Sequence, residues 1–193
     1  MERCYFGEKV ILKILDPCES GKVVRFYREN VDFFSPWEAG WADSYLMEEF
    51  QRAVLEQEEL SFRESQHVRF YVFEKNDSAC ETIIGTVSFF KVTRGVYWSA
   101  NMGYKIHKDY IKKGYGTDAV CTALQVVFDV WKLHRITCYV HHRNEASIRL
   151  MEKLHFEREG LCRSYVMIRG NWQDHYQYAY INSPEGSSSP EEG

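Results

Sequence analysis

The residues from Tyr104 to Ala119, YKIHKDYIKKGYGTDA, have types and spacing suited to binding a phosphorylated ligand. Four lysines precede two glycines, Gly114 and Gly116, in a chain whose overall net charge is -4. Glycines at a helix start let backbone N–H groups approach an anion, and the helix N-terminus adds a positive dipole end. We therefore predict a pyrophosphate site here, although an ordinary glycine-rich helix start with solvated lysines has the same pattern.

The surrounding residues restrict which phosphorylated ligand fits. The chain has no GxxxxGK(S/T) run, so a nucleoside-triphosphate loop is unsupported. Gly114, Gly116 and Ala119 match a relaxed dinucleotide pattern, but residues 108–113 separate the glycines from the preceding strand. The next strand ends in His141-His142-Arg143, where a dinucleotide site needs a carboxylate. These differences argue against NAD.

Other catalytic chemistries have weaker support. His141 and His142 are adjacent, and on an extended segment we expect them to point to opposite faces, so no metal site is predicted. The chain has no GxSxG, which leaves a serine hydrolase unsupported. None of the six cysteines forms a CxxC pair, which favours free thiols in a reducing compartment.

Hydrophobic periodicity predicts the elements that position the lysine and glycine segment. Strands are expected over residues 9–15, 68–74, 82–92, 97–106, 135–140, 163–168 and 176–181. Helices are expected over residues 23–33, 42–59, 117–133 and 144–154. Asp43 or Ser44 is a candidate cap for the second helix. The order predicts an α/β fold of the α+β kind, a mixed sheet flanked by helices, with parallel pairing across helix 117–133.

Length and composition indicate one globular domain. Of the 193 residues, 45% are hydrophobic and 27% are charged. We expect one domain over residues 1–182 and a disordered tail over 183–193, which has no large apolar side chain. The acidic balance argues against nucleic-acid binding. The most apolar window, 119–131, is shorter than a membrane span, and no apolar leader follows Met1, so we predict a cytoplasmic protein.

Three motifs carry a resemblance to a known family. They are the loop and helix start KKGYGTDAV, the run NEASIRLMEKLHF after the strand HRITCYV, and the segment NVDFFSPWE at residues 30–38. Over residues 8–181 the chain resembles the GNAT superfamily of acetyl-CoA-dependent N-acetyltransferases. More narrowly, it is similar to the RimJ/RimL-like branch, which acetylates the N-terminal amines of ribosomal proteins. The resemblance implies the acyl-CoA N-acyltransferase fold, with a mixed and mostly antiparallel central sheet.

Three residues depart from the family pattern. Ile111 stands where the phosphate loop usually has Gln or Arg, and Lys112 or Lys113 is then the source of charge. His155 replaces a Gly that commonly ends a helix in the left-handed conformation. Met151 stands where many members carry a Tyr that protonates the leaving thiolate.

The resemblance also implies how acetyl-CoA is held as co-substrate. Backbone amides between Met102 and Ile106 would serve the pantetheine and the oxyanion, Asn144 would bond the pantetheine arm, and the glycine loop would hold the pyrophosphate. The implied cofactor-binding residues are Met102, Tyr104, Ile106, Lys112, Lys113, Gly114, Tyr115, Gly116, Thr117 and Asn144.

The implied catalytic residues are Ser147, as the hydroxyl nearest the leaving sulfur, and Glu38, as a base for the amine. For Ser147 the alternative is a helix cap, and for Glu38 it is a solvated loop carboxylate or a water chain with no dedicated base. The implied acceptor is a protein N-terminal amine, with a polyamine or aminoglycoside-like amine as an alternative. A non-catalytic acyl-CoA-binding module also remains open, as do a monomer and a homodimer.

Overall fold

The computed structural model describes residues 2–182, so the predicted tail over 183–193 lies outside the described residues. Eight strands form the sheet: β1 (Cys4–Phe6), β2 (Val10–Lys13), β3 (Val68–Glu74), β4 (Gly85–Thr93), β5 (Ser99–Ile106), β6 (Arg135–His141), β7 (Glu157–Ile168) and β8 (Asn171–Ile181). The helices are α1 (Ser20–Phe34), α2 (Glu48–Arg63), α3 (Tyr115–Asp129) and α4 (Glu145–Lys153). Short 3₁₀ turns are η1 (Pro17–Glu19), η2 (Asp43–Leu46) and η3 (Lys108–Tyr110).

The strands lie in the order β1-β2-β3-β4-β5-β6-β8-β7. Neighbours pair antiparallel except β5 and β6, which are parallel and joined by α3. The predicted fold class, a mixed and mostly antiparallel sheet with flanking helices, is therefore confirmed. The predicted parallel pair across the third helix is also present.

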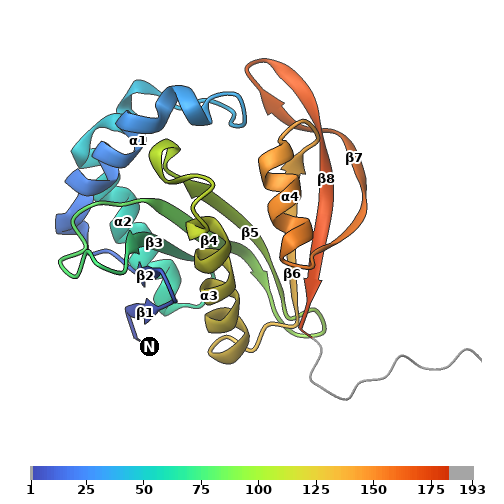
Figure 1. Cartoon of the computed structure of the whole chain (residues 1–193), viewed down its shortest axis with the longest axis horizontal. Helices are drawn as coiled ribbons and strands as arrows, with labels where there is room; N and C mark the ends of the chain where they lie inside the picture. Colours follow the sequence, from blue (N-terminus) through green and yellow to red (C-terminus); the bar gives the residue numbers. More distant parts are fainter. Residues whose placement is uncertain (1, 183–193) are drawn as a thin grey trace, which may run out of the picture.

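Helices cover both faces of the sheet, and alternation along β2 shows how the sequence divides between them. Val10 and Leu12 pack into the cluster that contains the buried residues of α3. Ile11, between them, joins the cluster of α1 residues on the other face. In Figure 1, α3 crosses the sheet and α4 lies beside it, next to β6 and β8. Phe70, Tyr71 and Phe73 of β3 are fully buried, as predicted for sheet core.

Several predicted boundaries are wrong by a few residues. The second helix begins at Glu48, because Asp43 and Ser44 lie in the separate turn η2. Met47 occupies the N-cap without a side-chain bond, so the predicted cap by Asp43 or Ser44 is wrong. The third helix spans Tyr115–Asp129, whereas residues 117–133 were predicted. It therefore begins two residues before the predicted start, directly after Gly114. The three-residue strand β1 was not predicted.

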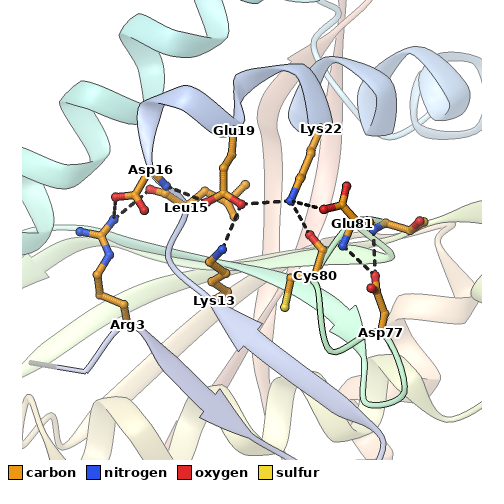
Figure 2. A network of polar contacts seen from close by, with 10 residues as sticks. Arg3, Lys13, Leu15, Asp16, Glu19, Lys22, Asp77, Cys80 and Glu81 are labelled. Atoms are coloured by element: carbon orange, nitrogen blue, oxygen red, sulfur yellow. Dashed lines mark hydrogen bonds and ion pairs between the residues drawn. The ribbon is translucent and has the colours of Figure 1, made fainter.

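A polar network beside the start of α1 joins elements far apart in sequence (Figure 2). The carboxylate of Glu19 accepts bonds from Lys13 and Lys22, and Lys22 also donates to the carbonyl of Cys80. Burial alone would raise the pKa of Glu19, but these bonds and the N–H of Asp16 hold it below its ordinary value. The network therefore fastens α1 to β2 and to the loop between β3 and β4. No helix within residues 2–182 is long and apolar enough to cross a membrane.

Candidate active site

The two parallel strands separate halfway along their length. Pairing of β5 with β6 runs from Ser99 with Arg135 to Met102 with Cys138, and then stops. Beyond it, β5 continues to Ile106 and β6 to His141. The N–H of His107 donates to the carbonyl of Ile84, just before β4, so by alternation the N–H groups of Tyr104 and Ile106 face the side where β6 has moved away. An extended ligand that enters this opening meets two backbone donors.

The loop after β5 presents a second set of backbone donors. The N–H of Tyr110 bonds back to His107 and the chain then turns through residues 111–112, whereas within residues 2–182 the N–H groups of 114–117 have no hydrogen-bond partner. Gly114, the N-cap of α3, adopts φ +88°, a left-handed conformation that favours glycine. Four consecutive free donors at a helix start, with Lys112 and Lys113 beside them, form an arrangement that can bind an anion.

Hydrogen bonds from the loop between β1 and β2 hold the first turn of α3 in place. The carboxylate of Asp118 accepts the N–H groups of Glu8, Lys9 and Val10 at 2.8–3.2 Å. The ammonium of Lys9 also donates to the carbonyl of Lys113 at 3.2 Å. A groove of about 640 Å³ lies beside the loop and is lined by residues that include Lys9, Lys75, Lys153, Gly114 and Thr117. Lys9, Lys75 and Lys153 thus add positive charge from three other parts of the chain, and the carboxylates of Glu8 and Asp118 line the same groove.

Gly116 marks a close approach between three elements. A Cβ at this position would lie 3.3 Å from Cγ1 of Ile106 and 3.7 Å from Cδ2 of Leu150 on α4. The absent side chain therefore lets the first turn of α3 rest against the end of β5 and against α4.

The start of helix α4 carries the two predicted polar residues, Asn144 and Ser147, and they have different roles. Asn144 is the N-cap, and its Oδ1 accepts the N–H of Ser147 at 3.2 Å. The alternative in which Ser147 caps the helix is therefore wrong. The hydroxyl of Ser147 instead accepts a 2.7 Å bond from the hydroxyl of Tyr104 on β5. Burial raises the pKa of Tyr104, so its phenol keeps its proton at neutral pH. Met151 is fully buried.

On the opposite face of the sheet, the loop after α1 crosses the opening. Glu38 forms a 2.7 Å ion pair with Lys105 of β5, so it is not a solvated loop carboxylate. The same ammonium lies 5.9 Å from the ring centroid of Tyr27. The neighbouring Trp37 packs edge-on against the ring of His141 at the end of β6, at 5.4 Å. Two adjacent residues thus contact the two strands that separate.

The histidines at the end of β6 do not point to opposite faces, and that prediction is wrong. The rings of His141 and His142 stack at 4.8 Å with an interplanar angle of 16°. The reason is that β6 ends at His141, so His142 no longer follows strand alternation. Burial, together with the nearby His142 and His175, lowers the pKa of His141. Residues 2–182 contain no group of three or more His, Cys, Asp or Glu side chains arranged to hold a metal ion.

Sequence reasoning missed the long-range partners of the site. Nothing in the local pattern pairs Glu38 with Lys105, or Asp118 with the N–H groups of residues 8–10. A charged residue just inside a helix start, such as Asp118, is a general signal for a capping role but does not identify its partner.

Comparison with known proteins agrees with this geometry. The model of the acetyltransferase (GNAT) domain family matches residues 16–157. The chain is 33% identical over 176 residues to the probable N-acetyltransferase YjcK of Bacillus subtilis, covering 91% of this chain and 96% of that protein. It is 26% identical over 168 residues to the [ribosomal protein uS5]-alanine N-acetyltransferase of Escherichia coli, covering 87% and 85% respectively.

A solved structure extends the likeness to three dimensions. The crystal structure of the ribosomal-protein-S5-alanine acetyltransferase from Vibrio fischeri superposes with a TM-score of 0.88 at 26% identity, covering 94% of this chain and 97% of that one. With the separated strands, the free loop amides and the family match, the chain belongs to the GNAT acetyltransferases, which are acetyl-CoA-dependent N-acetyltransferases.

Proposed function

We propose that this acetyltransferase transfers the acetyl group of acetyl-CoA to the N-terminal amine of a protein. The observation that carries the cofactor site is the opening beyond Met102 and Cys138, bordered by free N–H groups on β5 and on the following loop. The observation that favours a protein acceptor is the similarity to two enzymes named for acetylating the alanine of a ribosomal protein.

The cofactor residues divide by the part of acetyl-CoA that they meet. N–H groups of Gly114 to Thr117 bind the pyrophosphate, and the ammonium groups of Lys112 and Lys113 add charge. The N–H groups of Tyr104 and Ile106, in the open part of the strand, serve the pantetheine amides and the developing oxyanion. Met102 marks the point where the strands begin to part. Asn144 caps the helix with its Oδ1, and its Nδ2 is left to donate to the pantetheine arm.

The chemistry is attack by a neutral amine on a thioester. The C–N bond forms as the C–S bond breaks, and the electron pair leaves on sulfur, which then takes a proton. Ser147 is placed to hydrogen-bond that sulfur because it accepts its own bond from Tyr104 and keeps its proton free to donate. Glu38, held by Lys105 across the opening, is placed to attract an incoming ammonium and receive its proton, directly or through water.

The six cysteines, all free in the structure, support our proposal of a cytoplasmic location.

An acceptor screen tests the proposal. Purified enzyme and acetyl-CoA are incubated with peptides that begin with Ala or Ser, with spermidine and with an aminoglycoside, and free thiol is measured. We expect turnover with a peptide bearing a free N-terminus and none with its blocked counterpart. Turnover with only the small amines would contradict a protein acceptor, and no turnover despite acetyl-CoA binding would favour a non-catalytic module. Gly116→Val serves as the control that abolishes acetyl-CoA binding, because its side chain meets Ile106 and obstructs the loop.

A further inference from the structure

Asn30, the first residue of the segment NVDFFSPWE, has no part in the chemistry proposed above, yet it is fully buried in α1. Its Nδ2 donates to the carbonyl of Phe26 at 2.8 Å. Its Oδ1 accepts the N–H of Lys108 at 2.8 Å. Lys108 lies at the start of the loop between β5 and α3, which we propose to bind the cofactor. Asn is a weak helix former, and a buried amide is costly unless bonded. Its specific contribution here is the bond to the loop.

The residue before it makes a second tie to the same loop. The carboxylate of Glu29 lies 3.1 Å from Nε2 of His107, a ring that is 5% exposed. Nδ1 of His107 accepts the N–H of Asp109 at 3.2 Å, so the ring proton is on Nε2 and is donated to Glu29. Helix α1 thereby holds the N–H of Asp109 through the imidazole.

The two ties divide the loop into an anchored part and an available part. The N–H groups of residues 108–110 are all bonded, to Asn30, to His107 and to the carbonyl of His107. After the turn at residues 111–112, the N–H groups of Gly114 to Thr117 are those without a partner within residues 2–182. The anchors lie where β5 ends, at the bond from His107 to Ile84, and therefore set the direction in which the loop leaves the sheet.

We propose that Asn30 and the Glu29–His107 pair are positioning residues that aim the free N–H groups of the loop at the pyrophosphate of acetyl-CoA. The inference rests on the proposed cofactor site and adds two α1 residues to it. Because the loop between α1 and α2 contacts both separated strands through Trp37 and Glu38, one helix supports both the cofactor side and the acceptor side of the opening.

The test compares Asn30→Ala with Gln51→Ala. Gln51 of α2 is equally buried and donates one amide bond to a backbone carbonyl, but that carbonyl belongs to Tyr45 and not to the loop after β5. We expect Asn30→Ala to raise the Kd for acetyl-CoA, measured by calorimetry, by about 5- to 30-fold, as for loss of a buried bond. Gln51→Ala, which removes one hydrogen bond where Asn30→Ala removes two, should lose less stability and leave Kd unchanged. With S-acetylpantetheine, which lacks the pyrophosphate, Asn30→Ala should keep the wild-type kcat/KM.

A second pair of variants covers the case in which Asn30→Ala does not fold. Glu29 is about half exposed, so its replacement is tolerated. Glu29→Gln keeps an acceptor for Nε2 of His107 and should bind acetyl-CoA like the wild type, whereas Glu29→Met should bind it several-fold more weakly. Equal affinity of these two variants, or equal weakening by Asn30→Ala and Gln51→Ala, would overturn the inference. A wild-type protein that binds no acetyl-CoA would instead refute the proposed function.

Discussion

At the scale of single residues, Tyr104 and Ser147 form a polar contact that joins β5 to α4 beside the opening. The phenol donates and the serine oxygen accepts, so the serine proton is directed elsewhere. The phenol lies on a strand, whereas many family members carry a Tyr at the α4 position that Met151 fills here. The chain therefore keeps a phenol near the site without the α4 tyrosine.

Replacing Ser147 by Ala should lower kcat by about ten- to several-hundredfold and leave KM for acetyl-CoA nearly unchanged. The physical reason is that its hydrogen bond to sulfur strengthens only as charge develops on the leaving thiolate. Steady-state kinetics with the acceptor found in the screen measure both constants. Tyr104→Phe is the companion variant and should show a smaller loss. Equal kcat for Ser147→Ala and the wild type would remove the serine from the chemistry.

Asn144 combines a structural and a binding role, and two substitutions separate them. Asn144→Asp keeps the oxygen that caps α4 but loses the Nδ2 donor, so it should raise KM for acetyl-CoA with little change in Tm. Asn144→Ala loses both and should also lower stability by about 1 kcal/mol. Calorimetric melts and initial rates provide the two readouts. Unchanged KM in Asn144→Asp would show that the amide nitrogen does not contact the cofactor.

At the scale of elements, α2 and α4 end in the same way. After α4, the N–H of His155 bonds to Glu152 and that of Phe156 to Met151, with His155 at φ +60°. After α2, Ser65 at φ +54° and its successor make the equivalent bonds to Phe62 and Ser61. Both ends use a left-handed residue that is usually glycine. The His in place of the family Gly thus keeps the motif at a conformational cost.

His155→Gly should therefore stabilise the protein by about 0.5 to 1 kcal/mol, which corresponds to a rise in Tm of about 1 to 3 °C. His155 is exposed, so little packing is lost. Glu152→Gly, within α4, is the opposite control and should destabilise by about 1 kcal/mol. Thermal denaturation followed by circular dichroism measures both. A lower Tm for His155→Gly would mean that the imidazole makes a stabilising contact.

At the scale of the whole molecule, His67 links stability to pH. Burial, reinforced by the charge of Arg69, lowers its pKa to about 4. The unfolded chain binds this proton near pH 6.5 and the folded chain does not, so stability falls as pH drops from about 6.5 to about 4. The loss attributable to His67 should be about 1 to 2 kcal/mol, because the side chain is only partly buried. Urea unfolding across this range should show a shallower fall for His67→Gln. Parallel curves for the two proteins would contradict the assignment.

Local patterns predicted the sheet, the four helices and the loop that begins α3, because each rests on periodicity or on glycine spacing within one segment. What they missed depends on distance in three dimensions. Three residues are too few to show the alternation of a strand, so β1 was not predicted. The start of α2 at Glu48 was missed because the residue before it, Met47, is not a typical N-cap residue. The partner of Glu38 is 67 positions away, at Lys105, and is brought near only by the assembled fold.

The separation of β5 from β6 divides the backbone ladder into two blocks. Strands β1 to β5 pair with their sequence neighbours, and β6, β8 and β7 form the second block. In the described residues 2–182, four register pairs, Ser99–Met102 with Arg135–Cys138, join the blocks, and the carbonyl of Trp98 accepts two further N–H bonds at the same end. A ligand lodged in this seam contacts both blocks and acts as a removable crosslink between them. Amide exchange along β6 should therefore slow when acetyl-CoA is added, since opening the seam must first release the ligand.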